Sequence, residues 1–217
     1  MTQVLQAIES GKDAKFVVVA HGYSVFAQDG SVKFSPLALA VCDKVEELYK
    51  SGNVEHIILL GGHDIPAKID ATIADRMQRQ LCRTRGVPRH RVTTQCDFRD
   101  WERYVAPRDL VEEVVLLVQL ISDLRLVRVP VVSVIGDLWI PRARRLYDYY
   151  GIAPTFAPVP AEYTLRQRLE EFALRALAVR DPLGEGKWTG RHLKNVRRTR
   201  TPRLVPSGMY TLLRPKP

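Results

Sequence analysis

The chain has 217 residues, of which 46% are hydrophobic, and this length and composition suit one domain with a sizeable core. No run of about 18 apolar residues occurs, and the N-terminal segment lacks a basic start followed by an apolar block, so we expect neither a transmembrane anchor nor a secretory signal. The three cysteines are odd in number and have no CxxC spacing, which predicts reduced thiols in a cytoplasmic protein and no metal site; they are Cys42, Cys82 and Cys96.

The formal net charge of +9 is concentrated at the C-terminal end of the chain. Residues 187–217 contain nine Lys and Arg residues and no Asp or Glu, so the rest of the chain is formally neutral. We therefore divide the chain into an α/β domain at 1–180 and a basic C-terminal extension at 181–217. A solvated extension is the simplest interpretation, while nucleic acid, an acidic membrane surface or an acidic partner are alternative ligands for it.

In the first half of the chain, strand-like and helix-like segments alternate. A β-branched run at 15–20 predicts a buried strand, and a polar, glycine-containing loop follows it. Apolar residues spaced three and four apart predict a helix over 37–48. A second strand is expected at 56–60, a second helix at 69–81 and a short third strand at 91–94.

The second half continues the same alternation after an irregular stretch. It begins with a very apolar helix at 109–124 and a fourth strand at 129–135. A short helix at 140–150 and a fifth strand at 154–159 follow. The apolar positions that define a last helix are Leu165, Leu169, Phe172 and Ala176.

This order of elements predicts right-handed crossovers and a mainly parallel sheet covered by helices on both faces. The expected fold is a three-layer α/β/α Rossmann-like domain. In such domains ligands bind at the carboxyl ends of the strands, near the point where the strand order reverses.

Three loops that follow predicted strands carry glycine together with polar groups. They read HGYS at 21–24, GGHD at 61–64 and GDLWIPR at 136–142. Glycine permits a close approach of backbone N–H groups to a ligand, and the helix start beyond each loop favours an anionic group. Arg142 is placed to bind a carboxylate or phosphate. Together the loops predict a small-molecule site, whereas any one of them alone is ordinary turn chemistry.

Stronger motifs are absent from the sequence. The first strand is not followed by GxGxxG, and the chain contains neither GxxxxGK[ST], GxSxG nor HExxH. A standard dinucleotide fingerprint, a P-loop and a nucleophile elbow are therefore excluded as the basis of function.

The order of short motifs over residues 15–160 resembles the bacterial YdcF-like family, which includes the SanA and ElyC proteins. The motifs are VVVAHG, LYKSG, IILLGG, RGVP, PRDLVEE and IPRARRLYDYYGI. The resemblance implies a Rossmann-like fold and, from the cytoplasmic type, binding of S-adenosylmethionine. Some members carry an N-terminal membrane anchor and are linked to cell-envelope integrity.

The resemblance implies binding roles for several positions of this chain. Gly22 and the pair Gly61 and Gly62 match glycines that follow the first two strands of the family. Positions that match polar or helix-starting segments are Arg108, Asp109, Glu113, Pro141, Arg142 and Ala143. Trp139 replaces a usual histidine, Leu110 a usual threonine, Val41 a usual arginine and Ile73 a usual glutamate, so a divergent member with its own substrate, or one that only binds, is expected.

The leading hypothesis is a protein that binds an adenosyl-type, nucleotide-type or other anionic ligand and that is also a candidate enzyme. The backbone amides of the three glycines would hold the polar part of the ligand, and Tyr23 or Trp139 would stack on its ring. Hydroxyl or amine groups of the ligand would be bound by Asp109 and Glu113.

His63 is the candidate general acid or base, oriented by Asp64 or Asp137, although Asp137 could equally cap the following helix. The alternatives are a hydrolase or transferase for a small phosphorylated or amino-acid-like substrate, with His21 and His63 as acid, base or metal ligands, and a binding protein that uses its basic extension.

Overall fold

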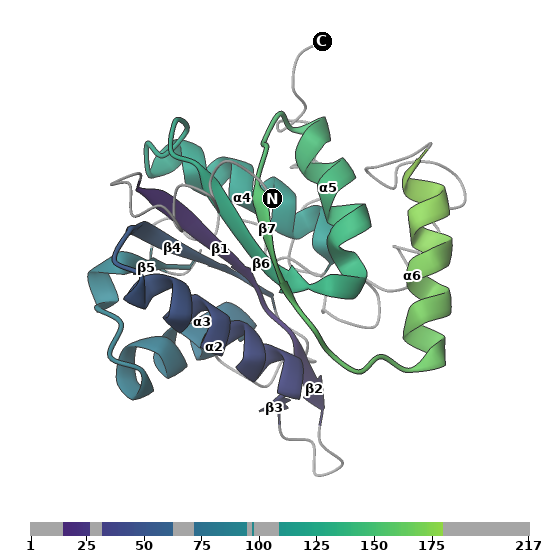
Figure 1. Ribbon diagram of the computed structural model, residues 1–217, viewed down its shortest axis with the longest axis horizontal. Helices are drawn as coiled ribbons and strands as arrows, with labels where there is room; N and C mark the ends of the chain where they lie inside the picture. Colours follow the sequence, from purple (N-terminus) through teal and green to yellow (C-terminus); the bar gives the residue numbers. More distant parts are fainter. Residues whose placement is uncertain (1–14, 27–31, 63–71, 95–96, 98–108, 180–217) are drawn as a thin grey trace.

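The computed structural model describes residues 15–26, 32–62, 72–94, 97 and 109–179. These residues form three layers, with one parallel sheet between two layers of helices (Figure 1). The three-layer Rossmann-like fold predicted from the alternation of elements is thus confirmed. The predicted basic extension at 181–217 lies outside the described residues.

Five strands form the sheet in the order β5-β4-β1-β6-β7, and all four neighbouring pairs are parallel. All residues of β1 and β6 are buried, which explains their nearly continuous apolar sequences. The strands are β1 (Phe16–His21), β4 (Val54–Leu60), β5 (Val92–Thr93), β6 (Val131–Gly136) and β7 (Thr155–Val159).

The strand order reverses between β1 and β6. From β1 the chain moves outward through β4 to β5, and then returns to the other side of β1 to form β6 and β7. The loops that leave β1 and β6 consequently diverge to opposite sides of the sheet. The carboxyl ends of these two strands are the position at which Rossmann-like proteins bind ligands.

Helices α2 (Pro36–Lys50) and α3 (Ile73–Arg79) cover one face of the sheet, and α4 (Leu110–Asp123) and α5 (Ile140–Tyr149) cover the other. Alternation along β1 divides its side chains between the two cores: Val18 belongs to the cluster with α2 and α3, and Val19 to the cluster with α4 and α5.

Most predicted elements are present within a few residues of their expected bounds. A short 3₁₀ turn, η2 (Arg89–Arg91), precedes β5 and shortens the expected third strand. The second helix begins at Ile73 and continues as a π-helical turn, η1 (Gln80–Thr84). The expected start of that helix, 69–71, lies outside the described residues.

The loop expected after β1 contains a small hairpin that the sequence did not predict. Strands β2 (Ser24–Phe26) and β3 (Val32–Phe34) pair in antiparallel fashion as a separate two-stranded sheet. Three residues are too few to establish a period-two pattern, so periodicity could not reveal these strands.

Helix α6 (Leu165–Ala178) lies outside the two layers that cover the sheet and packs against α5 and the 3₁₀ turn η5 (Asp137–Trp139) (Figure 1). Thr164 caps its N-terminus through a capping box with Gln167. The predicted last helix is confirmed, but its apolar stripe points to solvent: Phe172 is 72% exposed. None of the helices in the described ranges is long and apolar enough to cross a membrane.

Candidate functional site

The ends of β1 and β6 bring together residues that are far apart in the sequence. His21 is the last residue of β1, and Gly136 is the last residue of β6. Glu113 lies in the first turn of α4, whose N-terminus is capped by Asp109. The sequence singled out His21 and Glu113 as separate candidates, and the fold makes them neighbours.

His21 is completely buried and forms hydrogen bonds through both ring nitrogens. Its Nδ1 lies 2.6 Å from Oε2 of Glu113, and its Nε2 lies 3.0 Å from the hydroxyl of Tyr147. The Tyr147 hydroxyl is in turn 3.2 Å from Oγ of Ser133. An ionised Glu113 can only accept, so the ring proton on Nδ1 is donated to the carboxylate.

The four side chains therefore form a continuous hydrogen-bonded series, Glu113–His21–Tyr147–Ser133. With a neutral imidazole, Nε2 accepts from Tyr147; with a protonated ring, Nε2 donates and the hydroxyls reverse. Burial raises the pKa of the Tyr147 hydroxyl, which keeps it a neutral donor and acceptor. Such a series can accommodate a proton on Nδ1 alone or on both ring nitrogens of the imidazole.

Sequence reasoning missed Tyr147 and Ser133. Ser133 is the only polar side chain in the apolar strand VVSVIG, and a polar residue in a buried strand requires a hydrogen-bond partner. That signal was available, but the identity of the partner was not. Tyr147 lies on the buried face of α5, where its ring resembles any other core aromatic residue in a helical pattern.

An aromatic cluster lies next to this series, at the start of the loop after β6. The rings of Tyr23 and Trp139 are stacked, with centroids 4.7 Å apart, and Tyr163 meets Trp139 edge to face at 5.1 Å. Burial and the nearby Glu113 carboxylate raise the pKa of Tyr23. Tyr23 and Trp139, predicted as alternatives for stacking on a ligand ring, stack on one another here.

Gly136 makes the aromatic cluster possible. A Cβ atom at this position would lie 2.6 Å from Cζ3 of Trp139 and 2.7 Å from the hydroxyl oxygen of Tyr163, closer than real Cβ contacts. The glycine thus allows the two rings to approach the end of β6. Tyr163 was not predicted as a site residue.

The glycines after β1 and β4 pack the backbone around the start of α3. The N–H of Gly22 donates to the carbonyl oxygen of Leu60 at 2.7 Å, and a Cβ on Gly22 would lie 2.6 Å from Cγ2 of Ile73. Gly61 has a φ of +148°, a conformation that favours glycine. The structure gives these glycines a packing role, and their predicted role in binding a ligand stays a prediction.

The first backbone N–H groups of α3 already have acceptors. The carbonyl oxygens of Gly62 and Gly61 accept from Ile73 and Ala74 at 3.1 and 3.3 Å. The N–H of Asp75 donates to Oγ1 of Thr72 in a capping box. These contacts compete with the anion binding expected at the start of this helix.

Arg142, the predicted anion-binding residue, is paired within the protein. Its Nε lies 3.1 Å from both carboxylate oxygens of Glu171, and its Nη2 lies 3.0 Å from Oε2. Arg142 is 8% exposed and Glu171 2% exposed. Glu171 thus neutralises the guanidinium that was expected to bind a ligand, and the ion pair joins α5 to α6.

The remaining predicted residues divide into two groups. Asp109 caps α4, since its Oδ1 accepts from the N–H groups of Val111 and Glu112 at 3.0 and 3.1 Å. Asp137 is exposed and accepts from the N–H of Leu138 at 2.9 Å. His63, Asp64 and Arg108 lie outside the described residues.

Within the described part of the chain, no group of three or more His, Cys, Asp or Glu side chains is arranged to hold a metal ion. Cys42 and Cys82 are free thiols in the described ranges, and Cys96 lies outside them.

Comparison of the chain with protein-family models, with curated proteins and with solved structures found no match.

Proposed function

We propose that this protein binds a small adenosyl-type ligand at the carboxyl ends of β1 and β6, with S-adenosylmethionine as the specific candidate from the YdcF-like resemblance. The observation that carries the proposal is the buried pair of His21 and Glu113 where the strand order reverses, with Nδ1 and Oε2 2.6 Å apart. Glu113 is the more exposed partner, with 12% of its side chain accessible.

The charges at this edge favour a ligand with a positively charged group. Glu113 and Asp137 contribute carboxylates, while the guanidinium of Arg142 is compensated by Glu171. A carboxylate in a partly buried site attracts a sulfonium or ammonium group and repels a polyphosphate. This balance distinguishes S-adenosylmethionine from a nucleoside triphosphate.

The neighbouring aromatic rings supply the surface for an adenine. If the stacked Tyr23 and Trp139 rings separate, a base can insert between them. Such stacking accepts any of the bases, adenine included. Glu113 would then accept hydrogen bonds from the ligand's hydroxyl or ammonium groups.

The experiment is a thermal-shift titration with S-adenosylmethionine, S-adenosylhomocysteine, ATP and inorganic phosphate. At a concentration of about 100 Kd, a ligand specific for the native state should raise Tm by about 5–10 °C. We expect S-adenosylmethionine to act more strongly than ATP.

The matched variants are Glu113→Gln, at the site, and Glu47→Gln, an exposed carboxylate on α2 that is 66% accessible. Glu113→Gln should abolish the shift, and Glu47→Gln should retain it. A larger shift with ATP, or no shift with any of the compounds, contradicts the proposal.

A second candidate function, transferase or hydrolase chemistry on a small phosphorylated or amino-acid-like substrate, is favoured by the hydrogen-bonded series itself. Glu113 orients His21 through Nδ1, and Tyr147 contacts its Nε2, so the ring can take or release a proton. His63 stays the predicted acid or base that would touch the substrate. A large Tm increase with a divalent cation and none with S-adenosylmethionine would favour this function.

A further inference from the structure

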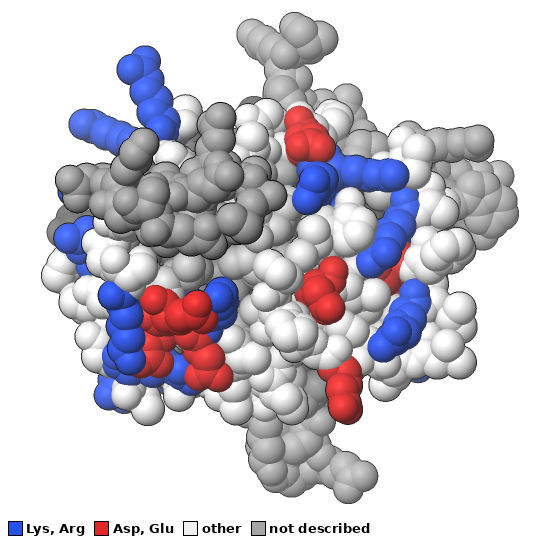
Figure 2. All heavy atoms as spheres, viewed as in Figure 1, with Lys and Arg blue, Asp and Glu red and all other residues white. Residues whose placement is uncertain are grey.

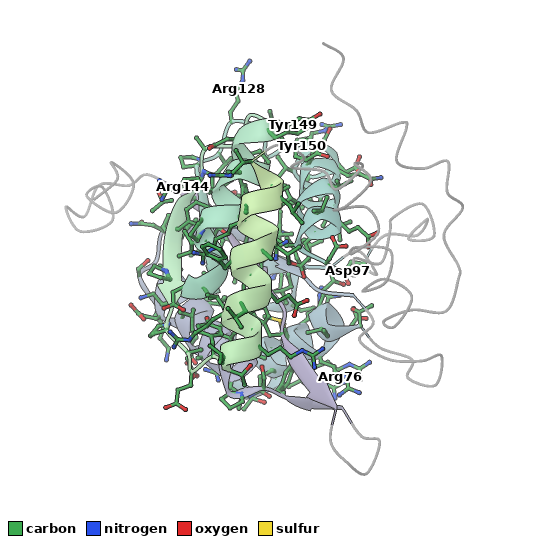
Figure 3. All side chains as sticks on the ribbon, turned by 90° about the vertical axis from the view of Figure 1, so that its right-hand side faces the viewer. Arg76, Asp97, Arg128, Arg144, Tyr149 and Tyr150 are labelled. Carbon is green, nitrogen blue, oxygen red and sulfur yellow. The ribbon has the colours of Figure 1, made fainter. Side chains whose placement is uncertain are left out.

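Helix α6 presents an exposed apolar stripe on the outermost part of the molecule. Leu165, Leu169, Phe172 and Val179 are 72%, 60%, 72% and 61% exposed, respectively. They follow one another at helical spacing, and Ala176 continues the same face. In Figure 3, α6 faces the viewer and crosses the front of the molecule. The stripe is the largest group of exposed large hydrophobic side chains on any one described element.

The opposite face of α6 fixes this orientation. Glu171 and Ala178 are 2% and 6% exposed, and Glu171 binds the guanidinium of Arg142 on α5. Arg145 of α5 also donates from Nη1 to the carbonyl oxygen of Arg175 at 3.3 Å. Because the face with Glu171 and Ala178 is held against the domain, the apolar stripe must point outward.

Basic residues border the stripe. On a helical projection Arg166 and Arg168 are the nearest charged residues on its two sides, and both are exposed; the exposed Glu170 lies further from the stripe, beyond Arg166. On the right-hand side of Figure 2, where α6 lies, Lys and Arg side chains appear beside uncharged atoms, with acidic side chains among them. The chain then continues past α6 into the sequence 187–217, which holds nine Lys and Arg residues and no acidic residue.

This charge distribution selects among occupants of the stripe. A second copy of α6 would add two further arginines, Arg166 and Arg168, to the same interface, and the chain's own 187–217 segment is also basic. A nucleic-acid duplex would place phosphates against the arginines, but its phosphate backbone offers no apolar surface to Leu169 or Phe172. An anionic phospholipid surface can bind both the apolar side chains and the arginines, because it offers acyl chains below a layer of negative headgroups.

We propose that α6 is a docking face for a membrane surface that contains anionic phospholipids. The helix would lie in the plane of the headgroups with Leu165, Leu169 and Phe172 toward the acyl chains. Arg166 and Arg168 would contact headgroup phosphates at either side.

The test is co-sedimentation of the full chain with vesicles of phosphatidylcholine alone and of phosphatidylcholine mixed about three to one with phosphatidylglycerol. We expect binding to the anionic vesicles that is at least about tenfold stronger than to the neutral ones, and that weakens as NaCl is raised from about 0.05 to 0.5 M.

Two variant pairs distinguish the stripe from the rest of the surface. Leu169→Ser/Phe172→Ser should reduce binding about tenfold or more, because it removes the side chains that enter the membrane. Leu39→Ser/Val127→Ser, which changes two exposed apolar residues elsewhere, should not. If the first variant does not fold, as judged by circular dichroism, Arg166→Gln/Arg168→Gln tests the same face, with the exposed pair Arg125→Gln/Arg128→Gln as its control.

Several outcomes overturn the proposal. One is equal binding of the wild type and of the stripe variants, which assigns the affinity to the basic extension alone. Others are absence of vesicle binding, salt-sensitive binding to duplex DNA in its place, or a concentration-dependent dimer in sedimentation equilibrium that Leu169→Ser/Phe172→Ser dissociates. None of these results depends on the adenosyl ligand, so the two proposals fail separately.

Discussion

At the scale of single residues, the hydrogen bonds of His21 are the central feature of the molecule. A completely buried imidazole requires partners for both nitrogens, and Glu113 and Tyr147 supply them. Tyr147 also satisfies Ser133, so one hydroxyl serves two buried polar groups. Removal of that hydroxyl should therefore cost more than the loss of one hydrogen bond.

We expect Tyr147→Phe to lower the free energy of unfolding by about 1–3 kcal/mol, because it leaves His21 Nε2 and Ser133 without a partner in a buried site. Urea denaturation measures the change. Tyr149→Phe, at an exposed tyrosine two residues away, should change stability by less than about 0.5 kcal/mol. Equal effects of the two substitutions would show that the series does not stabilise the fold.

At the scale of elements, two contacts hold the site in place. The first is the tight junction between the loop after β4 and the start of α3, where Gly61 adopts a φ of +148°. The second is the buried ion pair between Arg142 on α5 and Glu171 on α6. Each suggests a substitution whose effect can be compared with a matched control.

We expect Gly61→Ala to destabilise the protein by about 1–3 kcal/mol through backbone strain, with a further steric cost because its Cβ would lie 3.1 Å from Cβ of Ile73. Gly52→Ala also has a positive φ, +87°, but its Cβ would meet nothing within 4 Å. The difference between the two unfolding free energies measures the steric part. A larger loss for Gly52→Ala would contradict the packing role of Gly61.

Glu171→Ala should cost about 3–5 kcal/mol, because it leaves the Arg142 guanidinium buried without its counter-charge. Hydrogen exchange should show α6 opening first. Glu170→Ala, at an exposed neighbour on the same helix, is the control and should cost less than about 1 kcal/mol.

The double substitution Arg142→Met/Glu171→Leu should recover most of the stability lost in Glu171→Ala, since an apolar pair can replace a buried ion pair. No recovery in the double variant would mean that the destabilisation comes from lost helix packing and not from the unpaired buried charge of Arg142.

At the scale of the whole molecule, burial of ionisable groups makes stability depend on alkaline pH. Burial raises the pKa of Cys42 to about 12 and also raises the pKa values of Tyr23 and Tyr147. In the unfolded chain the cysteine loses its proton at about pH 8.5 and the tyrosines lose theirs at about pH 10. Their contribution to stability is complete below those values and is lost as the pH rises toward the folded-state pKa.

We therefore expect the free energy of unfolding to be nearly constant from about pH 7 to 8 and to fall progressively above about pH 9. Urea denaturation at increasing pH measures this, and Tyr147→Phe should reduce the steepness of the fall above about pH 10. Stability that does not change up to about pH 11 would contradict the burial of these groups.

Much of the fold could be predicted because its signals are local. The buried strands β1, β4 and β6 have nearly continuous apolar sequences, and the helices have apolar residues at spacings of three and four. The hairpin of β2 and β3 was missed because its strands are three residues long. For the candidate site, the end of the first strand pointed to His21 and the YdcF-like resemblance implied Glu113, but their pairing joins positions 92 residues apart in sequence.

The sequence by itself determined the succession of the longer strands and helices along the chain, the three-layer class and the concentration of positive charge in residues 187–217. These features follow from periodicity and composition, which depend only on residue types along the chain. Only the tertiary structure decided which polar groups meet. It joined His21 to Tyr147, compensated Arg142 with Glu171 and turned the Leu169 face of α6 toward solvent, because the partner of a buried polar group is set by proximity in space.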